Sequence, residues 1–212
     1  MNREHLQLDY GLRFDWGLPG AKAIGTAADV AVVVDVLSFT TTLTVAVDAG
    51  IDVLPYRWND DSAERYARDS DAVLAVGRSR TANGQISLSP NTIRRTAAPR
   101  RLVLPSPNGS TISFELGAGT GVCVGASLRN ATAVAGWIAR HCTSTSVVSV
   151  IAAGDSARRG VADTLPQSLT VCASGRELCA AGYPEDVAIA AEVDRSTAVP
   201  VLEDRVFRTA SP

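Results

Sequence analysis

The chain has 212 residues, with 20 Lys plus Arg against 22 Asp plus Glu and a formal net charge of −2. This length favours a single domain with a sizeable core, which we place over residues 1–212. The balanced charge leaves no concentrated basic face, so we expect no nucleic-acid partner. The four cysteines form no CxxC pair and no His lies at metal spacing from them, which argues against a zinc site.

The sequence contains no secretory signal pattern and no apolar run near the roughly 20 residues that span a bilayer. We therefore expect a cytoplasmic protein with reduced thiols and no membrane contact.

Apolar, β-branched runs alternate with helical patterns along the chain, which is the order typical of an α/β protein. In chain order, the patterns predict strands at residues 31–34, 52–56, 72–76, 101–105, 122–124 and 146–152. They predict helices at 40–49, 60–69, 110–116, 129–140, 175–181 and 185–193, a loop at 77–89, and an edge strand or extended tail at 199–207. The predicted fold class is α/β, with three α/β/α layers around a mixed, largely parallel sheet.

Residues 104–111 (LPSPNGST) lie where the strand at 101–105 passes into the next helix. Unpaired N–H groups and the positive end of the dipole at a helix N-terminus favour an anion there. Asn108, Gly109, Ser110 and Thr111 are thus a candidate cradle for a phosphate or sulfonate. The alternative is that Asn-Gly forms a turn and Ser caps the helix, with no ligand.

Asp35 directly follows the buried strand at 31–34, and ligands of open α/β sheets bind outside the carboxyl ends of the strands. A carboxylate at this place suits Mg²⁺, which prefers oxygen ligands and keeps several waters. Ser38 and Thr40 to Thr42 add hydroxyl groups that suit an anionic substrate. Both features have a plainer alternative, since Asp and Thr also cap helices.

The sequence lacks the residues that three other kinds of protein need. A haloacid-dehalogenase-type phosphatase needs a second Asp two residues after the first, and that position is Leu37. A Ser-His-Asp hydrolase needs a His at a strand end, which neither His5 nor His141 supplies. The glycine-rich segment 117–121 follows a helix and precedes a strand, so it is interpreted as a helix cap and turn instead of a dinucleotide loop.

Three segments in register carry a family resemblance: residues 33–42 (VVDVLSFTTT), 107–111 (PNGST) and 125–133 (GASLRNATA). Together they resemble the ComB family, the 2-phosphosulfolactate phosphatases. Residues 13–17 (RFDWG) and 172–178 (CASGREL) also resemble an actinobacterial-looking branch of that family.

The resemblance implies a Mg²⁺-dependent phosphomonoesterase acting on a small anionic acid that carries a phosphate and a sulfonate. It implies that Asp35 holds the metal or positions the attacking water, and that the 108–111 turn holds the anion. We assign catalytic roles to Asp35, Asn108 and Thr111, substrate contacts to Thr40, Thr41, Arg78, Gly109, Ser110 and Asn130, and metal binding to Asp35 and Asp155.

Basic residues that follow strands could complete the site. Arg78 and Arg80 come after the strand at 72–76, where guanidinium groups can bind phosphate or sulfonate bidentately. Arg78 is the preferred candidate, and Arg129 is a third one, although an Arg at the start of a helix is more often exposed to solvent.

The chain departs from the family pattern after Gly154, where a block of several tens of residues is absent. In the family this block is an acidic segment that leads into a Gly-Ala-Gly helix and a further helical stretch. Asp155 or Asp163 then supplies the missing carboxylate, or the protein binds an anion without turnover. A third alternative is a general α/β hydrolase or transferase that shares only the sheet. Loss of a covering helix would also expose an apolar patch, which gives a physical reason for a homodimer.

Overall fold

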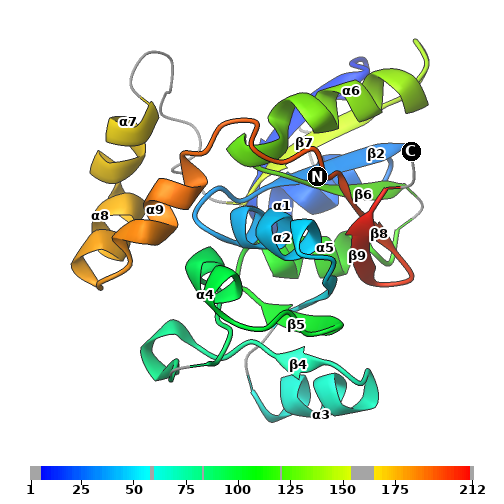
Figure 1. The fold of residues 1–212 in the computed structure, drawn as a ribbon. Helices are drawn as coiled ribbons and strands as arrows, with labels where there is room; N and C mark the ends of the chain where they lie inside the picture. The colour runs from blue at the N-terminus through cyan, green and yellow to red at the C-terminus, as the bar shows by residue number, and fades with distance from the viewer. Residues whose placement is uncertain (1–5, 58–59, 83, 120, 154–164, 211–212) are drawn as a thin grey trace.

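The computed structural model describes residues 6–57, 60–82, 84–119, 121–153 and 165–210, and Figure 1 shows the path of the chain. In this part of the chain, nine strands form one sheet in the order β1-β7-β2-β6-β8-β9-β3-β5-β4. The strands are β1 (Leu12–Trp16), β2 (Val30–Val34), β3 (Asp52–Tyr56), β4 (Val73–Leu74), β5 (Arg101–Pro105), β6 (Val122–Ala126), β7 (Val148–Ala152), β8 (Pro200–Glu203) and β9 (Val206–Thr209).

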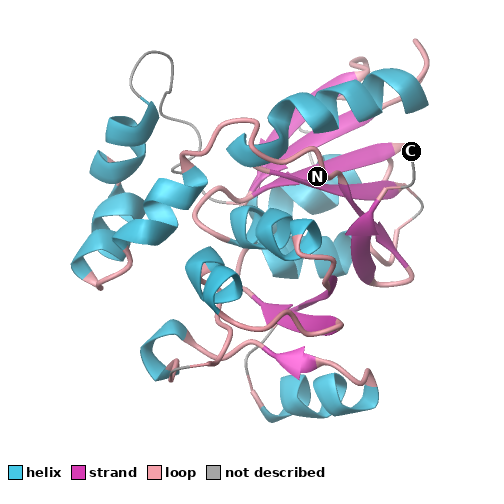
Figure 2. Cartoon of the chain, in the orientation of Figure 1, coloured by secondary structure: helices cyan, strands magenta, loops and turns pink. Residues whose placement is uncertain are grey.

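Helices follow most of these strands along the chain, and Figure 2 distinguishes the helices from the strands by colour. The α-helices are α1 (Gly17–Gly20), α2 (Phe39–Asp48), α3 (Asp61–Asp69), α4 (Pro90–Arg95), α5 (Gly109–Leu116), α6 (Ala131–His141), α7 (Leu165–Val171), α8 (Ala173–Ala180) and α9 (Pro184–Ala190). A π-helical segment, η2 (Ala21–Gly25), and two 3₁₀ turns, η3 (Arg78–Arg80) and η4 (Leu128–Asn130), complete the set.

The sheet consists of two parallel parts joined by an antiparallel hairpin. Strands β1, β7, β2 and β6 pair in parallel, as do β3, β5 and β4. The β8–β9 hairpin pairs antiparallel with β6 on one side and with β3 on the other. The predicted α/β class with a mixed, largely parallel sheet is therefore confirmed.

Helices α2 and α5 lie between the two parts of the sheet and carry the main core (Figure 1). Val33 of β2, Phe39 and Leu43 of α2, Ile112 of α5 and Phe207 of β9 are buried together there. This packing fixes the N-termini of both helices close to the strand ends, which is where the candidate site residues lie.

Two outer helices, α6 and α3, cover the face of the sheet that points away from α2 and α5. Helix α6 packs Val134 and Trp137 over β2 and β6, and α3 packs Ala67 over β3 and β5. Helix α3 begins at a clear signal, because the Asp60 carboxylate accepts hydrogen bonds from the N–H groups of Ser62 and Ala63.

The prediction of an edge strand or extended tail at 199–207 is wrong. This segment belongs to the β8–β9 hairpin, which lies inside the sheet between β6 and β3. Asp204 and Arg205, with φ of 50° and 63°, form the two-residue turn between the strands. Positive φ at both central residues is the geometry that matches strand twist, but it is usually signalled by Asn or Gly.

Smaller differences follow from local pairing. The strand predicted at 72–76 is only two residues long, since Val76 leaves the sheet to bridge Ser87. The loop at 77–89 contains η3, and the helix predicted from 129 begins with the 3₁₀ turn η4, because Ser127 and Asn130 form a capping box. The sequence patterns also missed β1, α1, η2, α4 and α7.

Strand β1 is an edge of the sheet and carries apolar side chains that the described helices leave exposed: Leu12, Phe14 and Trp16. The Gln7 side-chain amide bonds both the N–H and the carbonyl of Phe14, which shields part of the free edge. The homodimer expected from the sequence stays a prediction. Every helix within the described ranges is too short or too polar to cross a bilayer.

Candidate active site

The loop from β2 into α2 is closed by hydrogen bonds of its own residues. The Asp35 N–H donates to Thr40 Oγ1 at 2.8 Å, and the Thr40 N–H donates back to the Asp35 carbonyl at 2.9 Å. Thr41 Oγ1 donates to the Val36 carbonyl at 2.7 Å. Both threonines are buried, so their hydroxyls shape the loop that presents Asp35.

The segment from β5 into α5 is fixed in the same way. Ser110 Oγ donates to the Leu104 carbonyl at 2.8 Å and accepts the Tyr56 N–H at 2.7 Å, which ties the ends of β5 and β3 together. Thr111 Oγ1 donates to the Ser106 carbonyl at 3.0 Å. Ser110 and Thr111 therefore hold the turn in place, while Asn108, at the N-cap of α5, is exposed.

These two loops meet at Asp35 and Gly109. The Gly109 N–H donates to Asp35 Oδ2 at 3.0 Å, so the first N–H of α5 faces a carboxylate of the chain itself. Burial raises the pKa of Asp35 above its usual range, although the Gly109 and Phe39 N–H groups and the positive charge of Arg78 act to lower that pKa. Asp35 is thus a carboxylate whose negative charge the chain only partly compensates.

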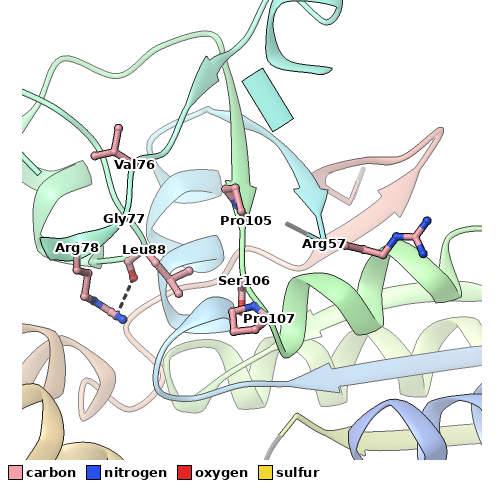
Figure 3. Close-up of a pocket in the computed structure, with 8 residues that line it drawn as sticks. All are labelled: Arg57, Val76, Gly77, Arg78, Leu88, Pro105, Ser106 and Pro107. Carbon is pink, nitrogen blue, oxygen red and sulfur yellow. Dashed lines mark hydrogen bonds between the residues drawn. The ribbon is translucent and has the colours of Figure 1, made fainter. Parts of the chain in front are cut away.

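A cavity of about 370 Å³ lies at the ends of β3 and β5 and at the turn after β4 (Figure 3). It is lined by Arg57, Val76, Gly77, Arg78, Leu88, Pro105, Ser106 and Pro107. In Figure 3, Arg57 and Arg78 lie on opposite sides of the Pro105–Pro107 segment. Asp35, Gly109 and Arg80 are not among the lining residues. Gly109, which bonds Asp35, comes two residues after the lining residue Pro107.

Several contacts hold the Arg78 side chain in the wall of the cavity. Its Nη2 donates to Ser38 Oγ at 2.5 Å and to the Leu88 carbonyl at 3.0 Å. Its Nε lies 3.3 Å from Asp186 Oδ2. Since Ser38 belongs to the same loop as Asp35, Arg78 connects the cavity to that loop from a second side.

Arg57 is a cavity residue that the sequence patterns missed. Its guanidinium lies 4.6 Å from the centre of the Phe114 ring, and its Nη1 lies 2.8 Å from Glu115 Oε1. Arg57 directly follows β3, so the strand-end criterion that selected Asp35 would also have found it.

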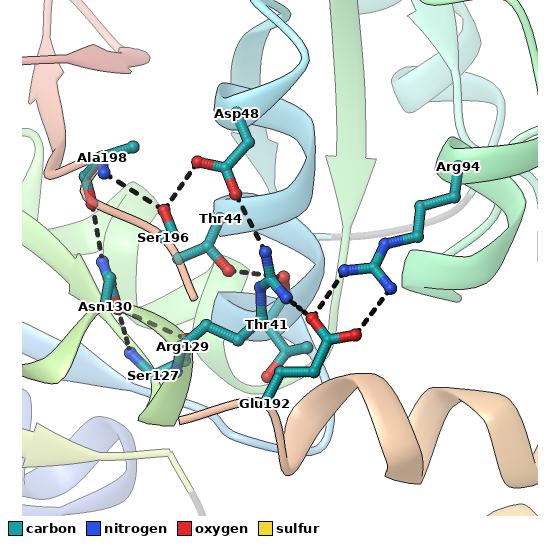
Figure 4. Close-up of polar contacts among 10 residues, drawn as sticks. All are labelled: Thr41, Thr44, Asp48, Arg94, Ser127, Arg129, Asn130, Glu192, Ser196 and Ala198. Carbon is teal, nitrogen blue, oxygen red and sulfur yellow. Dashed lines mark hydrogen bonds and ion pairs between the residues drawn. The ribbon is translucent and has the colours of Figure 1, made fainter. Parts of the chain in front are cut away.

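Asn130 lies apart from the cavity, with its amide fully engaged (Figure 4). Its Oδ1 accepts the Ser127 N–H at 2.8 Å, and its Nδ2 donates to the carbonyls of Gly125 and Ala198 at 3.2 and 3.1 Å. Because the side chain is completely buried, these contacts hold the end of β6 against the segment that leads into β8.

The expectation of a solvent-exposed Arg129 is wrong. Its side chain is buried between two carboxylates, with Nη2 at 2.9 Å from Asp48 and Nη1 paired with Glu192, which also pairs with Arg94 (Figure 4). Two carboxylates offset the cost of burying the charge. This network therefore joins η4, α2, α4 and the segment after α9.

The second proposed metal ligand, Asp155, and the alternative Asp163 lie outside the described residues. Among the residues that are described, no three His, Cys, Asp or Glu side chains gather as a metal-binding group. Asp35 still fits Mg²⁺, because this ion is often held by one or two carboxylates together with waters and substrate phosphate. A bound cation would also stabilise the ionised form of Asp35, which burial disfavours.

Comparison with known proteins identifies the family of the chain. The sequence pattern of the 2-phosphosulpholactate phosphatase family matches residues 20–166, which include Asp35, Arg57, Arg78 and Gly109. A protein of Thermus thermophilus, described as a probable 2-phosphosulfolactate phosphatase, is 27% identical over 215 residues, covering 84% of this chain and 90% of that protein. The chain therefore belongs to the 2-phosphosulpholactate phosphatase family and is a phosphoric monoester hydrolase.

Proposed function

We propose that this protein is a Mg²⁺-dependent phosphatase that hydrolyses 2-phosphosulfolactate, or a closely similar phosphorylated acid, to the free hydroxy acid and phosphate. The observation that carries the proposal is the cavity lined by Arg57 and Arg78, whose residue Arg78 bonds Ser38 in the loop that presents Asp35 and its partner Gly109. These residues all lie within the region that matches the family.

The cavity suits a small molecule with more than one anionic group. Its volume of about 370 Å³ is within the usual range for small-molecule sites. Guanidinium groups bind phosphate, sulfonate and carboxylate through paired N–H donors. Arginines on two sides of one cavity can therefore hold the phosphate and an acidic group of the same substrate.

Asp35 is the residue that we assign to Mg²⁺ or to the attacking water. When bound, Mg²⁺ would neutralise charge on the phosphoryl oxygens. In the reaction, the water oxygen forms a bond to phosphorus and gives up a proton, the bond from phosphorus to the ester oxygen breaks, and that oxygen takes up a proton and leaves as the hydroxyl of the acid. The Gly109 N–H orients the Asp35 carboxylate for this task.

We also place the protein in the cytoplasm. The support is that all four cysteines are free in the structure, and unpaired thiols are typical of a reducing compartment.

The test is phosphate release from 2-phosphosulfolactate and from a panel of other small phosphomonoesters, with Mg²⁺ or with EDTA. We expect Mg²⁺-dependent turnover that is lost in Asp35→Asn and retained in Asp52→Asn, whose carboxylate pairs with Arg208 away from the cavity. If phosphate or sulfate raises the melting temperature but no ester is hydrolysed, the chain is an anion-binding relative without turnover.

A further inference from the structure

Asp186 is a buried carboxylate next to the cavity, and it lies beyond the region that matches the family. It belongs to α9, and its side chain is 1% exposed. Its Oδ1 accepts a hydrogen bond from Ser89 Oγ, and its Oδ2 lies 3.3 Å from Nε of the cavity residue Arg78. The ion pair with Arg78 and the hydrogen bond from Ser89 offset part of the cost of burying this carboxylate, although Arg78 Nε and Asp186 Oδ2 do not form a hydrogen bond with each other.

Tyr183, at the N-cap of α9, contacts the same arginine. Its hydroxyl donates to the Arg78 carbonyl at 2.8 Å, and its ring centre lies 5.8 Å from the Arg78 guanidinium carbon. The start of α9 thus holds both the backbone and the side chain of Arg78, from more than 100 residues away in the sequence.

The contacts around Arg78 divide its guanidinium into a held part and an open part. Nε faces Asp186, and Nη2 bonds Ser38 and the Leu88 carbonyl, whereas the side chain keeps 22% of its surface exposed where it lines the cavity. A long Arg side chain has many rotamers, and ordering it on binding costs conformational entropy. Contacts that fix the side chain before the ligand arrives remove this entropy cost from binding.

We propose that Asp186 is a positioning residue that fixes the guanidinium of Arg78 for the anionic group of the substrate, so that α9 completes the active site. This inference rests on the proposed function, in which Arg78 contacts the substrate. Asp186 itself does not touch the substrate, because its carboxylate lies behind the guanidinium and is buried.

Asp186→Asn is a suitable variant because it keeps the shape of the side chain. If the Asn oxygen accepts from Ser89, its NH₂ group must face Arg78 Nε, and two donors then meet. We expect the guanidinium to lose its fixed position.

Glu192→Gln is the matched control. Glu192 pairs with Arg94 and Arg129, so it ties the same C-terminal segment to the rest of the chain without contacting a residue that lines the Arg57–Arg78 cavity. These three residues line a separate cavity. A merely structural role of Asp186 predicts that the two variants behave alike.

The experiment measures KM and kcat for the best phosphomonoester, and the Kd of inorganic phosphate by calorimetric titration. For Asp186→Asn we expect KM and the phosphate Kd to rise by up to about ten- to a hundredfold, the size of a lost charge-assisted hydrogen bond between the displaced Arg78 guanidinium and the anion, with a smaller change in kcat. Glu192→Gln should leave both values unchanged. In Arg78→Ala, adding Asp186→Asn should cause no further loss, because Asp186 acts through Arg78.

Other results overturn the proposal: an unchanged phosphate Kd in Asp186→Asn, an equal effect of Glu192→Gln, or additive losses in the double variant. If Asp186→Asn does not fold, Tyr183→Phe and Ser89→Ala replace it, and each should raise the phosphate Kd in the same direction. A wild-type chain that binds phosphate but hydrolyses no ester refutes the proposed function alone, whereas one that binds no phosphate refutes both.

Discussion

The Gly109 N–H donates to Asp35 Oδ2 at 3.0 Å, so the start of α5 is joined to the residue that follows β2. A Cβ atom on Gly109 would lie 2.7 Å from Oδ2 and 2.7 Å from Cδ1 of Phe39. Phe39 is completely buried and cannot move aside, which means that this contact requires a glycine.

The first prediction concerns Gly109→Ala. We expect a loss of roughly 1–3 kcal/mol in the free energy of unfolding, the usual cost of overpacking, together with a large loss of phosphatase activity because Asp35 is displaced. Denaturant unfolding and phosphate release measure the two effects. Gly136→Ala is the control: its Cβ would lie 3.4 Å from an Arg140 side-chain nitrogen, and it should keep full activity while stabilising α6. Full activity in Gly109→Ala would contradict the assigned role of the pair.

The second prediction concerns pH and Asp35. Burial raises the pKa of Asp35 above its usual value of 3.8, so the ionised carboxylate destabilises the folded chain relative to the protonated one. A raised folded-state pKa contributes stability at low pH that is lost as the pH rises through that pKa. In EDTA, Asp35→Asn should therefore melt at a higher temperature than the wild type at pH 7, and the difference should shrink as the pH falls toward 4.

Thermal melts of both proteins between pH 4 and pH 8 check this prediction. Asp60→Asn serves as a comparison, because its change in melting temperature at pH 7 should have the opposite sign: the hydrogen bond from Ser62 lowers the pKa of Asp60. An Asp35→Asn variant that is less stable than the wild type at pH 7 would show that the Gly109 hydrogen bond outweighs the cost of burying the charge.

The parts of the site that the sequence revealed are those set by local order along the chain. Asp35 follows a continuous apolar strand and Gly109 begins a helix after another, so both could be placed at strand ends before the strands were assembled. The same reasoning could have included Arg57. Local order also sufficed for β2, β3 and β5, whose apolar runs are buried as such runs in parallel sheets usually are.

The parts that the sequence did not reveal depend on distant partners. Asp186 and Tyr183 belong to the site only through their contacts with Arg78, and a helix such as α9 gives no local signal that it packs beside a cavity. Arg129 is buried because Asp48 and Glu192 compensate its charge from other elements. The β8–β9 hairpin lies inside the sheet because of its pairing with β6 and β3, which local patterns do not encode.

The third prediction concerns Mg²⁺ binding, with a measurement that is independent of turnover. A ligand that binds only the folded state stabilises it by about 2.7 kcal/mol at a concentration of 100 Kd. Mg²⁺ should therefore raise the melting temperature of the wild type and have little effect on Asp35→Asn. NaCl at equal ionic strength is the control for screening. Equal shifts in both proteins would place the cation elsewhere.

The fourth prediction concerns Arg57, which lines the cavity opposite Arg78. Its removal takes away a charge-assisted contact worth about 1.5–3 kcal/mol, or about ten- to a hundredfold in binding. For Arg57→Ala we expect this rise in KM for a substrate with a second acidic group. A phosphomonoester without such a group should lose less, because only the phosphate then needs a partner.

Arg208→Ala is the matched control for Arg57→Ala. The two side chains are similarly exposed, at 42% and 44%, and each pairs with one carboxylate, but Arg208 pairs with Asp52 on β3 and is not part of the cavity lining. Breaking such a surface ion pair costs at most about 1 kcal/mol of stability, so both variants should melt close to the wild type. If KM rises equally in both variants, or equally for substrates with and without the second acidic group, Arg57 does not select that group.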